Sequence, residues 1–314
     1  MKKGFLIVVL ILLSVISLFV GVTDFGLGDL LNFSDDGIHI LLVSRLPRLI
    51  SILVAGTGMS ISGLIMQQIS RNKFVSPTTA ATIDSAKMGV LASMIFFASA
   101  NAFQRMILAF IFALVGTFIF MKILDRIKFK NTIFIPLVGI MLGNIIDSVT
   151  TFIAYRFDMV QNISTWLQGD FSMIIKGRYE LIYLSIPLVF IAYFYANKFT
   201  VAGMGEDFAA NLGLNYKKVV NIGIGIVALI SSLVIITVGR IPFLGLIIPN
   251  MVTLFNGDNM KKNIVPTALL GSVFLLTADI LGRVIIYPYE ISISLIVGVV
   301  GSVIFLYLLL RRNK

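Results

Sequence analysis

The chain has 314 residues, of which 58% are hydrophobic and only 13% are charged, with a formal net charge of +10 and a mean hydropathy of +1.01. A soluble domain is about 45–50% apolar and about 25% charged, so this composition excludes a single water-soluble core and indicates a membrane protein. The absence of cysteine excludes disulfides and thiolate metal sites, and the one histidine, His39, cannot build a multi-histidine metal centre.

Long apolar runs predict about ten transmembrane helices, since a helix needs about 20 mostly apolar residues to cross a bilayer. The predicted spans are 4–23, 46–69, 78–99, 103–125, 132–155, 181–199, 218–239, 243–256, 264–285 and 291–310. The first follows Met1-Lys2-Lys3 and lacks an Ala-x-Ala cleavage pattern, so we expect an uncleaved span. The sequence therefore predicts an all-α polytopic membrane protein with one transmembrane domain over residues 1–314.

Small residues crowd the second span. Gly56 and Ser60, and likewise Gly58 and Ser62, lie four positions apart. This spacing lets helix backbones approach closely in a bilayer, where no hydrophobic driving force acts between helices. We interpret these residues as a packing face. The eighth span is short and contains Pro249, so we expect it to be buried among its neighbours.

Charged residues inside the spans are the first functional candidates. Asp84 and Lys87 are three positions apart and are expected to neutralise each other, as are Asp279 and Arg283, which are four apart. Asp147 is either a proton or cation site of a secondary transporter or a hydrogen-bonded interior residue.

Two features are expected on the outer side. The loop between the fifth and sixth spans contains the only tryptophan, Trp166, which is either an interfacial anchor or part of a short helix lining the outer mouth. Arg240-Ile241-Pro242 echoes Arg45-Leu46-Pro47 and would mark two related halves.

Lysine and arginine set the orientation. With both termini in the cytoplasm, the inner loops hold twice as many of these residues as the outer loops, as the positive-inside rule requires. The basic excess thus marks the cytoplasmic rim of a membrane protein, and no nucleic-acid partner is expected.

One polar stretch, residues 203–216, interrupts the apolar runs on the predicted cytoplasmic side. It has glycines near both ends and an alanine-containing centre that is compatible with a short helix. We interpret it as a docking element for a soluble partner.

Several catalytic patterns are absent from the sequence. It contains no Gly-x-x-x-x-Gly-Lys-Ser/Thr loop, no dinucleotide fingerprint after a strand and no His-Glu-x-x-His motif. We therefore expect neither an enzyme nor a P-loop ATP site in this chain, and no cofactor, catalytic residue or bound metal.

Five stretches, in this order, carry the motifs of one known family. They are Arg45-Leu46-Pro47-Arg48-Leu49 leading to Ser62-Gly63 and Gln67; Arg71-Asn72 with Ser76-Pro77; Trp166-Leu167-Gln168-Gly169; residues 203–215 with Ala210-Asn211-Leu212-Gly213; and residues 242–250 with Gly257-Asp258, Ala278-Asp279, Arg283 and Glu290. Together they resemble the FecCD/BtuC-type permease subunits of ABC importers for iron-siderophores, haem and vitamin B12.

Some motifs depart from the family pattern. The usual Arg-Asn-Pro-Leu-Ala reads Arg71-Asn72-Lys73-Phe74-Val75, and the usual Pro-His reads Pro249-Asn250. These changes are not expected to alter the fold. They suggest a divergent branch, similar to permeases of Gram-positive importers for catecholate siderophores such as petrobactin.

The resemblance implies a type II ABC importer permease fold and three groups of functional residues. In the family, a short cytoplasmic helix docks in a groove of the ATPase; the matching positions are Gly205, Glu206, Ala209, Leu212 and Gly213. Outer arginines meet glutamates of the substrate-binding protein, and their counterparts are Arg45, Arg48 and Arg283. The expected residues of the translocation path are Asn144, Ser148 and Ser302.

The resemblance also implies partners. They are a second permease subunit, identical or homologous, a pair of cytoplasmic ABC ATPases, an extracellular substrate-binding lipoprotein, the ferric siderophore and membrane lipid. The chain would then be a multi-pass subunit of the cytoplasmic membrane that hydrolyses no ATP itself. The alternative is an ion-gradient-driven secondary transporter that uses Asp147.

Overall fold

The computed structural model describes residues 2–21, 35–79, 81–126 and 134–312, and these ranges contain helices and connecting turns but no β-strand. The helices are α1 (Lys3–Phe19), α3 (Asp35–Ile40), α4 (Leu46–Ile69), α5 (Thr82–Phe96), α6 (Ala102–Arg126), α7 (Phe134–Arg156), α8 (Val160–Leu167), α9 (Ser185–Ala202), α10 (Glu206–Asn211), α11 (Tyr216–Val238), α12 (Leu244–Asn256), α13 (Met260–Val284) and α14 (Ile293–Arg312). The predicted all-α fold is confirmed, and each predicted span corresponds to one of these helices.

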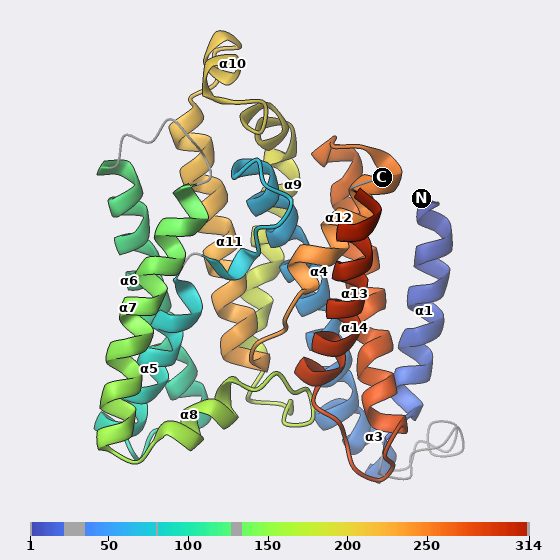
Figure 1. Cartoon of the computed structure of the whole chain (residues 1–314). Coiled ribbons are helices and arrows are strands. Elements are labelled where there is room, and N and C mark those ends of the chain that lie inside the picture. The colour runs from blue at the N-terminus through green and yellow to red at the C-terminus, as the bar shows by residue number, and fades with distance from the viewer. Residues whose placement is uncertain (1, 22–34, 80, 127–133, 313–314) are drawn as a thin grey trace.

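The long helices run side by side between two ends of the molecule (Figure 1). Six helical stretches within the described ranges are long and apolar enough to cross a bilayer alone, and three shorter apolar helices, α1, α12 and most of α14, accompany them. The predicted span 46–69 coincides with α4. α5 begins at Thr82 rather than at 78, because Pro77 opens a 3-10 turn and Ala81 has a left-handed φ of 56°.

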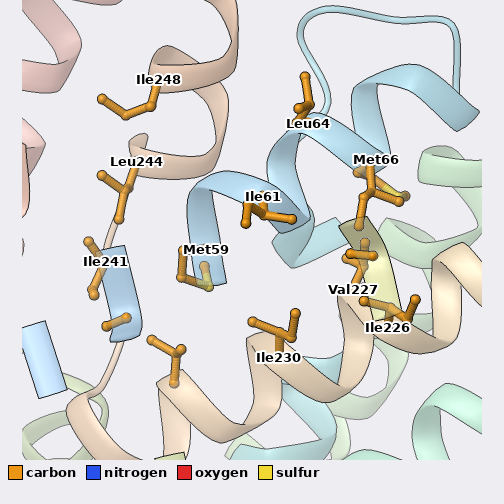
Figure 2. Packing of buried hydrophobic residues seen from close by; sticks show 14 of the residues in the cluster. Met59, Ile61, Leu64, Met66, Ile226, Val227, Ile230, Ile241, Leu244 and Ile248 are labelled. Carbon is orange, nitrogen blue, oxygen red and sulfur yellow. The ribbon is translucent and has the colours of Figure 1, made fainter. Parts of the chain in front are cut away.

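The core is built around α4, which packs against α11, α12 and α13. Its buried Met59 and Ile61 face Ile230 of α11, while Leu244 of α12 closes the cluster from the other side (Figure 2). Because α4 buries residues on all of its faces, it is the central helix of the bundle. α12, the short helix with an internal proline, packs among α4, α13 and α14, as predicted.

Small residues bring α4 and α13 into backbone contact. A Cβ atom at Gly56 would lie 2.8 Å from Cα of Ser272 and 2.9 Å from the carbonyl oxygen of Gly271. At this seam the hydroxyl groups of Thr57 and Ser272 are 2.9 Å apart, and Ser272 also donates to the carbonyl oxygen of Leu53. The packing role predicted for the glycine-rich face of α4 is therefore confirmed.

Alanine substitutions test this contact. We expect Gly56→Ala to lower the melting temperature of the detergent-purified protein, because the added methyl group meets backbone atoms that cannot rotate away, at a cost of about 1–3 kcal/mol. Gly225→Ala in α11 is the matched control, since nothing lies within 4 Å of its added methyl group. Equal melting temperatures for the two variants would contradict the assigned seam.

Candidate functional site

α10 is a six-residue helix that projects from the end of α9. It lies at the same end of the molecule as both termini, opposite α8 (Figure 1). Gly205 and Gly213 have φ values of 120° and 73°, which let the chain turn sharply into and out of the helix. Asn215 then caps α11 by accepting a hydrogen bond from the backbone N–H of Lys218 at 3.0 Å. The short helix predicted within residues 203–216 is thus present.

The faces of α10 differ in exposure. Ala209 is fully buried, and its carbonyl oxygen accepts a hydrogen bond from the N–H of Leu214 at 2.9 Å. Glu206, Leu212 and Gly213 lie on the surface, with Leu212 61% exposed. Of the residues predicted to contact a partner, Ala209 therefore supports the turn from within and offers no surface in this structure.

Two apolar side chains that the sequence reasoning did not select complete this surface. Phe208 is 48% exposed on α10, and Met204 just before the helix is 53% exposed. Both lie beyond the ends of the long helices, where lipid does not account for exposed apolar groups. The sequence does distinguish these two residues, because they are large and apolar within a stretch that is mostly polar or small.

A charged network joins α4, α13 and the segment between α13 and α14 near the end opposite α10. Arg48 lies 2.8 Å from Asp279 and 2.9 Å from Glu290, and Arg283 lies 2.5 Å from the second oxygen of Asp279. The predicted pair of Asp279 and Arg283 is confirmed. These side chains are largely buried, so the network satisfies charges inside the bundle.

The same network holds the end of α1. Arg283 donates hydrogen bonds to the carbonyl oxygens of Ser17 and Val20, and Arg45 donates to that of Val20 at 2.6 Å. Carbonyl groups in the last turn of a helix lack partners within the helix, so the two guanidinium groups supply the missing donors. Arg45 is 7% exposed and Arg283 2% exposed. Both are turned inward, contrary to the outward orientation that the resemblance implied.

The three predicted path residues lie in different surroundings. Asn144 of α7 lines a cavity of about 630 Å³. Ser148 is exposed on α7 but donates to the carbonyl oxygen of Asn144, and half-buried Ser302 donates to that of Gly298 on α14. Four further polar residues that line this cavity were not predicted from the sequence to belong to the path: Ser164, Gln168, Arg240 and Ser294.

Three chain segments meet at one wall of the cavity: the residues at the end of α8, those around Arg240 and the first turn of α14. The backbone N–H of Arg240 donates to the carbonyl oxygen of Leu167 at 2.9 Å, and that of Ser294 donates to Gly169 at 3.2 Å. A Cβ atom at Gly239, which has a φ of 93°, would lie 2.6 Å from the carbonyl oxygen of Gln168. The Trp-Leu-Gln-Gly motif and the residues around Arg240 are therefore parts of one structure.

The short helix predicted around Trp166 is present, and the interfacial-anchor role of this side chain stays a prediction. Trp166 belongs to α8, whose Ile163 and Leu167 are 1% and 6% exposed against α5 and α11. α8 lies across the ends of the long helices (Figure 1), and its Ser164 lines the cavity.

The predicted pair of Asp84 and Lys87 is wrong. Lys87 instead contacts Asp147 of α7 at 2.7 Å, and Asp84 lies 3.7 Å from Arg240. Both residues of α5 therefore face elements packed beside it. Asp84 can do so because Gly143 of α7 has no side chain, which leaves room for the carboxylate.

Both a family model and individual proteins are similar to this chain over nearly its whole length. The model of the FecCD transport family matches residues 9–311. The petrobactin import system permease protein YclN of Bacillus subtilis (strain 168) is 64% identical over 313 residues, covering 100% of this chain and 99% of the relative. The petrobactin import system permease protein FatD of Bacillus anthracis is 39% identical over 308 residues, covering 98% and 90%.

A solved structure gives the same fold. An inward-facing conformation of a metal-chelate type ABC transporter superposes with a TM-score of 0.87 at 20% identity, covering 98% of each chain. At this identity the likeness concerns the fold, which is that of an ABC importer permease. Because the family model spans nearly the whole sequence and the two relatives share well over 30% of their residues with it, the chain belongs to the FecCD transport family.

Proposed function

We propose that this chain is the permease subunit of an ATP-driven importer that carries a ferric siderophore across the cytoplasmic membrane. The observation that carries the proposal is the 64% identity, over the whole chain, to a petrobactin import permease. In this proposal residues 1–314 form one permease domain, which pairs with an identical or homologous permease to enclose the path. An extracellular lipoprotein delivers the chelate, and a pair of cytoplasmic ATPases powers its movement.

The end of the molecule that carries α10 is assigned to the cytoplasm. Both termini lie at this end (Figure 1), in agreement with the distribution of lysine and arginine in the loops. Phe208 and Leu212 offer apolar side chains there on a short helix with a rigid base. Such an element fits a groove of a protein partner, so α10 is proposed as the contact for the ATPase.

Charge substitution on α10 tests this contact. We expect Leu212→Asp combined with Phe208→Asp to lower the amount of ATPase that co-purifies with the permease by about tenfold or more, because apolar anchors of an interface contribute about 2 kcal/mol or more. Lys261→Glu, an exposed change in the first turn of α13, is the control. ATPase recovery equal to that of the parent would overturn the assignment.

The energy source separates this proposal from the secondary-transporter alternative. Asp147, the residue on which that alternative depends, is paired with Lys87 at 2.7 Å and so has a protein cation in place of a transported ion. ABC permeases are driven by ATP, and membership in the FecCD transport family favours that source.

Uptake into vesicles that contain the complete importer measures the energy source directly. We expect accumulation of radioactive iron chelate to stop when ATP is removed and to continue when a protonophore abolishes the membrane potential. Accumulation that survives ATP removal and collapses with the potential would restore the Asp147 alternative.

The outer face is proposed to dock the binding protein through exposed cations. Docking through Arg45, Arg48 and Arg283 stays a prediction, and the inward orientation of Arg45 and Arg283 means that they would have to turn to reach a partner. Lys176 and Arg178 are exposed, and the backbone N–H of Lys176 donates to the carbonyl oxygen of Val43 at 3.0 Å. This bond places their loop beside the buried arginines, so they offer positive charge at the same surface.

Reversal of these charges tests the docking surface. We expect Lys176→Glu combined with Arg178→Glu to weaken binding of the lipoprotein by up to about thirtyfold at low ionic strength, since exposed ion pairs contribute about 0–1 kcal/mol each. The difference should shrink as salt screens the charges. Lys198→Glu, an exposed change near the opposite end of the bundle, is the control. Identical affinities at low salt would remove these two residues from the interface.

A further inference from the structure

The cavity beside α7 holds four charged side chains that the proposed function does not yet use. α5 contributes Asp84 and Lys87, α7 contributes Asp147, and the segment between α11 and α12 contributes Arg240. Charged residues within spans are costly, by about 2.5–3.5 kcal/mol each on insertion scales, and those retained usually serve transport. Their convergence on one cavity of about 630 Å³ makes it a candidate binding site.

The cavity holds two cations and two carboxylates, but one of the cations, Arg240, makes no side-chain hydrogen bond to the residues that the structure describes. Lys87 donates hydrogen bonds to Asp147 at 2.7 Å and to Thr151 at 3.1 Å. Arg240 lies 3.7 Å from Asp84, too far for a hydrogen bond, and its side chain makes none within the part of the chain that the structure describes. It is also 47% exposed and meets Asp84 only at ion-pair distance, so its N–H donors can turn to a ligand.

The free donors identify the chemistry of that ligand. A guanidinium group presents a planar fork that matches two oxygens of a carboxylate or a similar oxyanion. Lys87 adds a second cation, and its partner Asp147 is 41% exposed, so the carboxylate can move into solvent when an incoming anion takes its place beside Lys87. A metal cation fits less well, because both carboxylates of the cavity already face protein cations.

Neutral polar groups around the cations suit the same ligand. Asn144, Ser164 and Gln168 line the cavity from α7, α8 and the junction after α8. Gln168 is held by its own contact to Ser292 at 3.2 Å, and the backbone of Arg240 is fixed by the bond to Leu167. The backbone that carries Arg240 and the side chain of Gln168 are therefore held before any ligand arrives, which lowers the entropy lost on binding, while the guanidinium group keeps the freedom to turn to the ligand.

We propose that this cavity is a charge-selective station of the translocation path, where Arg240 and Lys87 bind the anionic oxygens of a ferric chelate. The inference rests on the proposed function and adds the chemistry of its cargo. It also assigns part of the importer's selectivity to the permease, beyond what a binding protein supplies.

The absence of cysteine in the chain permits a direct test. Ser164→Cys places a single thiol of this subunit in the cavity. In vesicles that contain the complete importer, we would measure the rate at which N-ethylmaleimide, a neutral reagent, labels it. Ferric citrate is the anionic probe, and ferrichrome, a neutral ferric hydroxamate, is the comparison. The background variants are Arg240→Gln and Lys87→Gln, with Lys198→Gln as the control outside the cavity.

We expect ferric citrate to protect the thiol. In the Arg240→Gln and Lys87→Gln backgrounds, the concentration that gives half protection should rise by about tenfold to a hundredfold, as for loss of a charge-assisted hydrogen bond. The labelling rate without chelate should stay the same, which shows that the cavity keeps its shape. Ferrichrome should protect weakly and equally in every background.

Absent protection by ferric citrate, or half protection at the same concentration in all backgrounds, would overturn the charged station. Stronger protection by ferrichrome than by ferric citrate would do the same, since the cavity would then select by shape. ATP-dependent uptake is recorded in the same vesicles. Uptake that needs ATP while the protection results fail leaves the proposed function intact. Protection as expected together with uptake that does not need ATP leaves the station but removes that function.

Discussion

The contact between α4 and α13 is the constraint on which the rest of the structure depends. In lipid, apolar side chains gain little by leaving one apolar surface for another, so two helices associate closely only where small residues let their backbones meet. Gly56 and Gly271 provide that approach, and the hydroxyl groups beside them fill the seam. With the helices in this register, Arg48 of α4 lies opposite Asp279 of α13.

The spans were predictable because the bilayer imposes its own length and polarity on every crossing helix. Apolar runs of about 20 residues gave α4 within its observed bounds, and they gave α11 and α13 with shifts of only a few residues. The start of α5 was missed because it depends on a left-handed turn at Ala81, which no hydropathy pattern encodes. Glycines at both ends of residues 203–216 correctly indicated a short helix there.

The candidate sites were less predictable because their geometry arises between helices. The pair of Asp84 and Lys87 looked self-sufficient by spacing along one helix, yet α7 offers Lys87 a better partner in Asp147. Arg45 and Arg283 lie near the end of the bundle opposite α10, but their inward orientation follows from the open carbonyl groups of α1. Ala209 shows the same limit, since the face of a six-residue helix that is buried depends on what packs beneath it.

The hydrogen bonds that close the turns around α10 have a mechanical consequence. The N–H of Gly205 bonds to Ala202 at 3.1 Å, and that of Leu214 bonds to Ala209 at 2.9 Å, so short bonded turns connect α9, α10 and α11. Because these connections are short and hydrogen-bonded, the hairpin cannot deform much when α10 is displaced. A displacement applied to its tip would reach α9 and α11, and α11 runs through the core to the segment that carries Arg240. The short helix α10 is thus connected through α11 to the wall of the cavity that carries Arg240, so a movement of α10 would change the position of that wall.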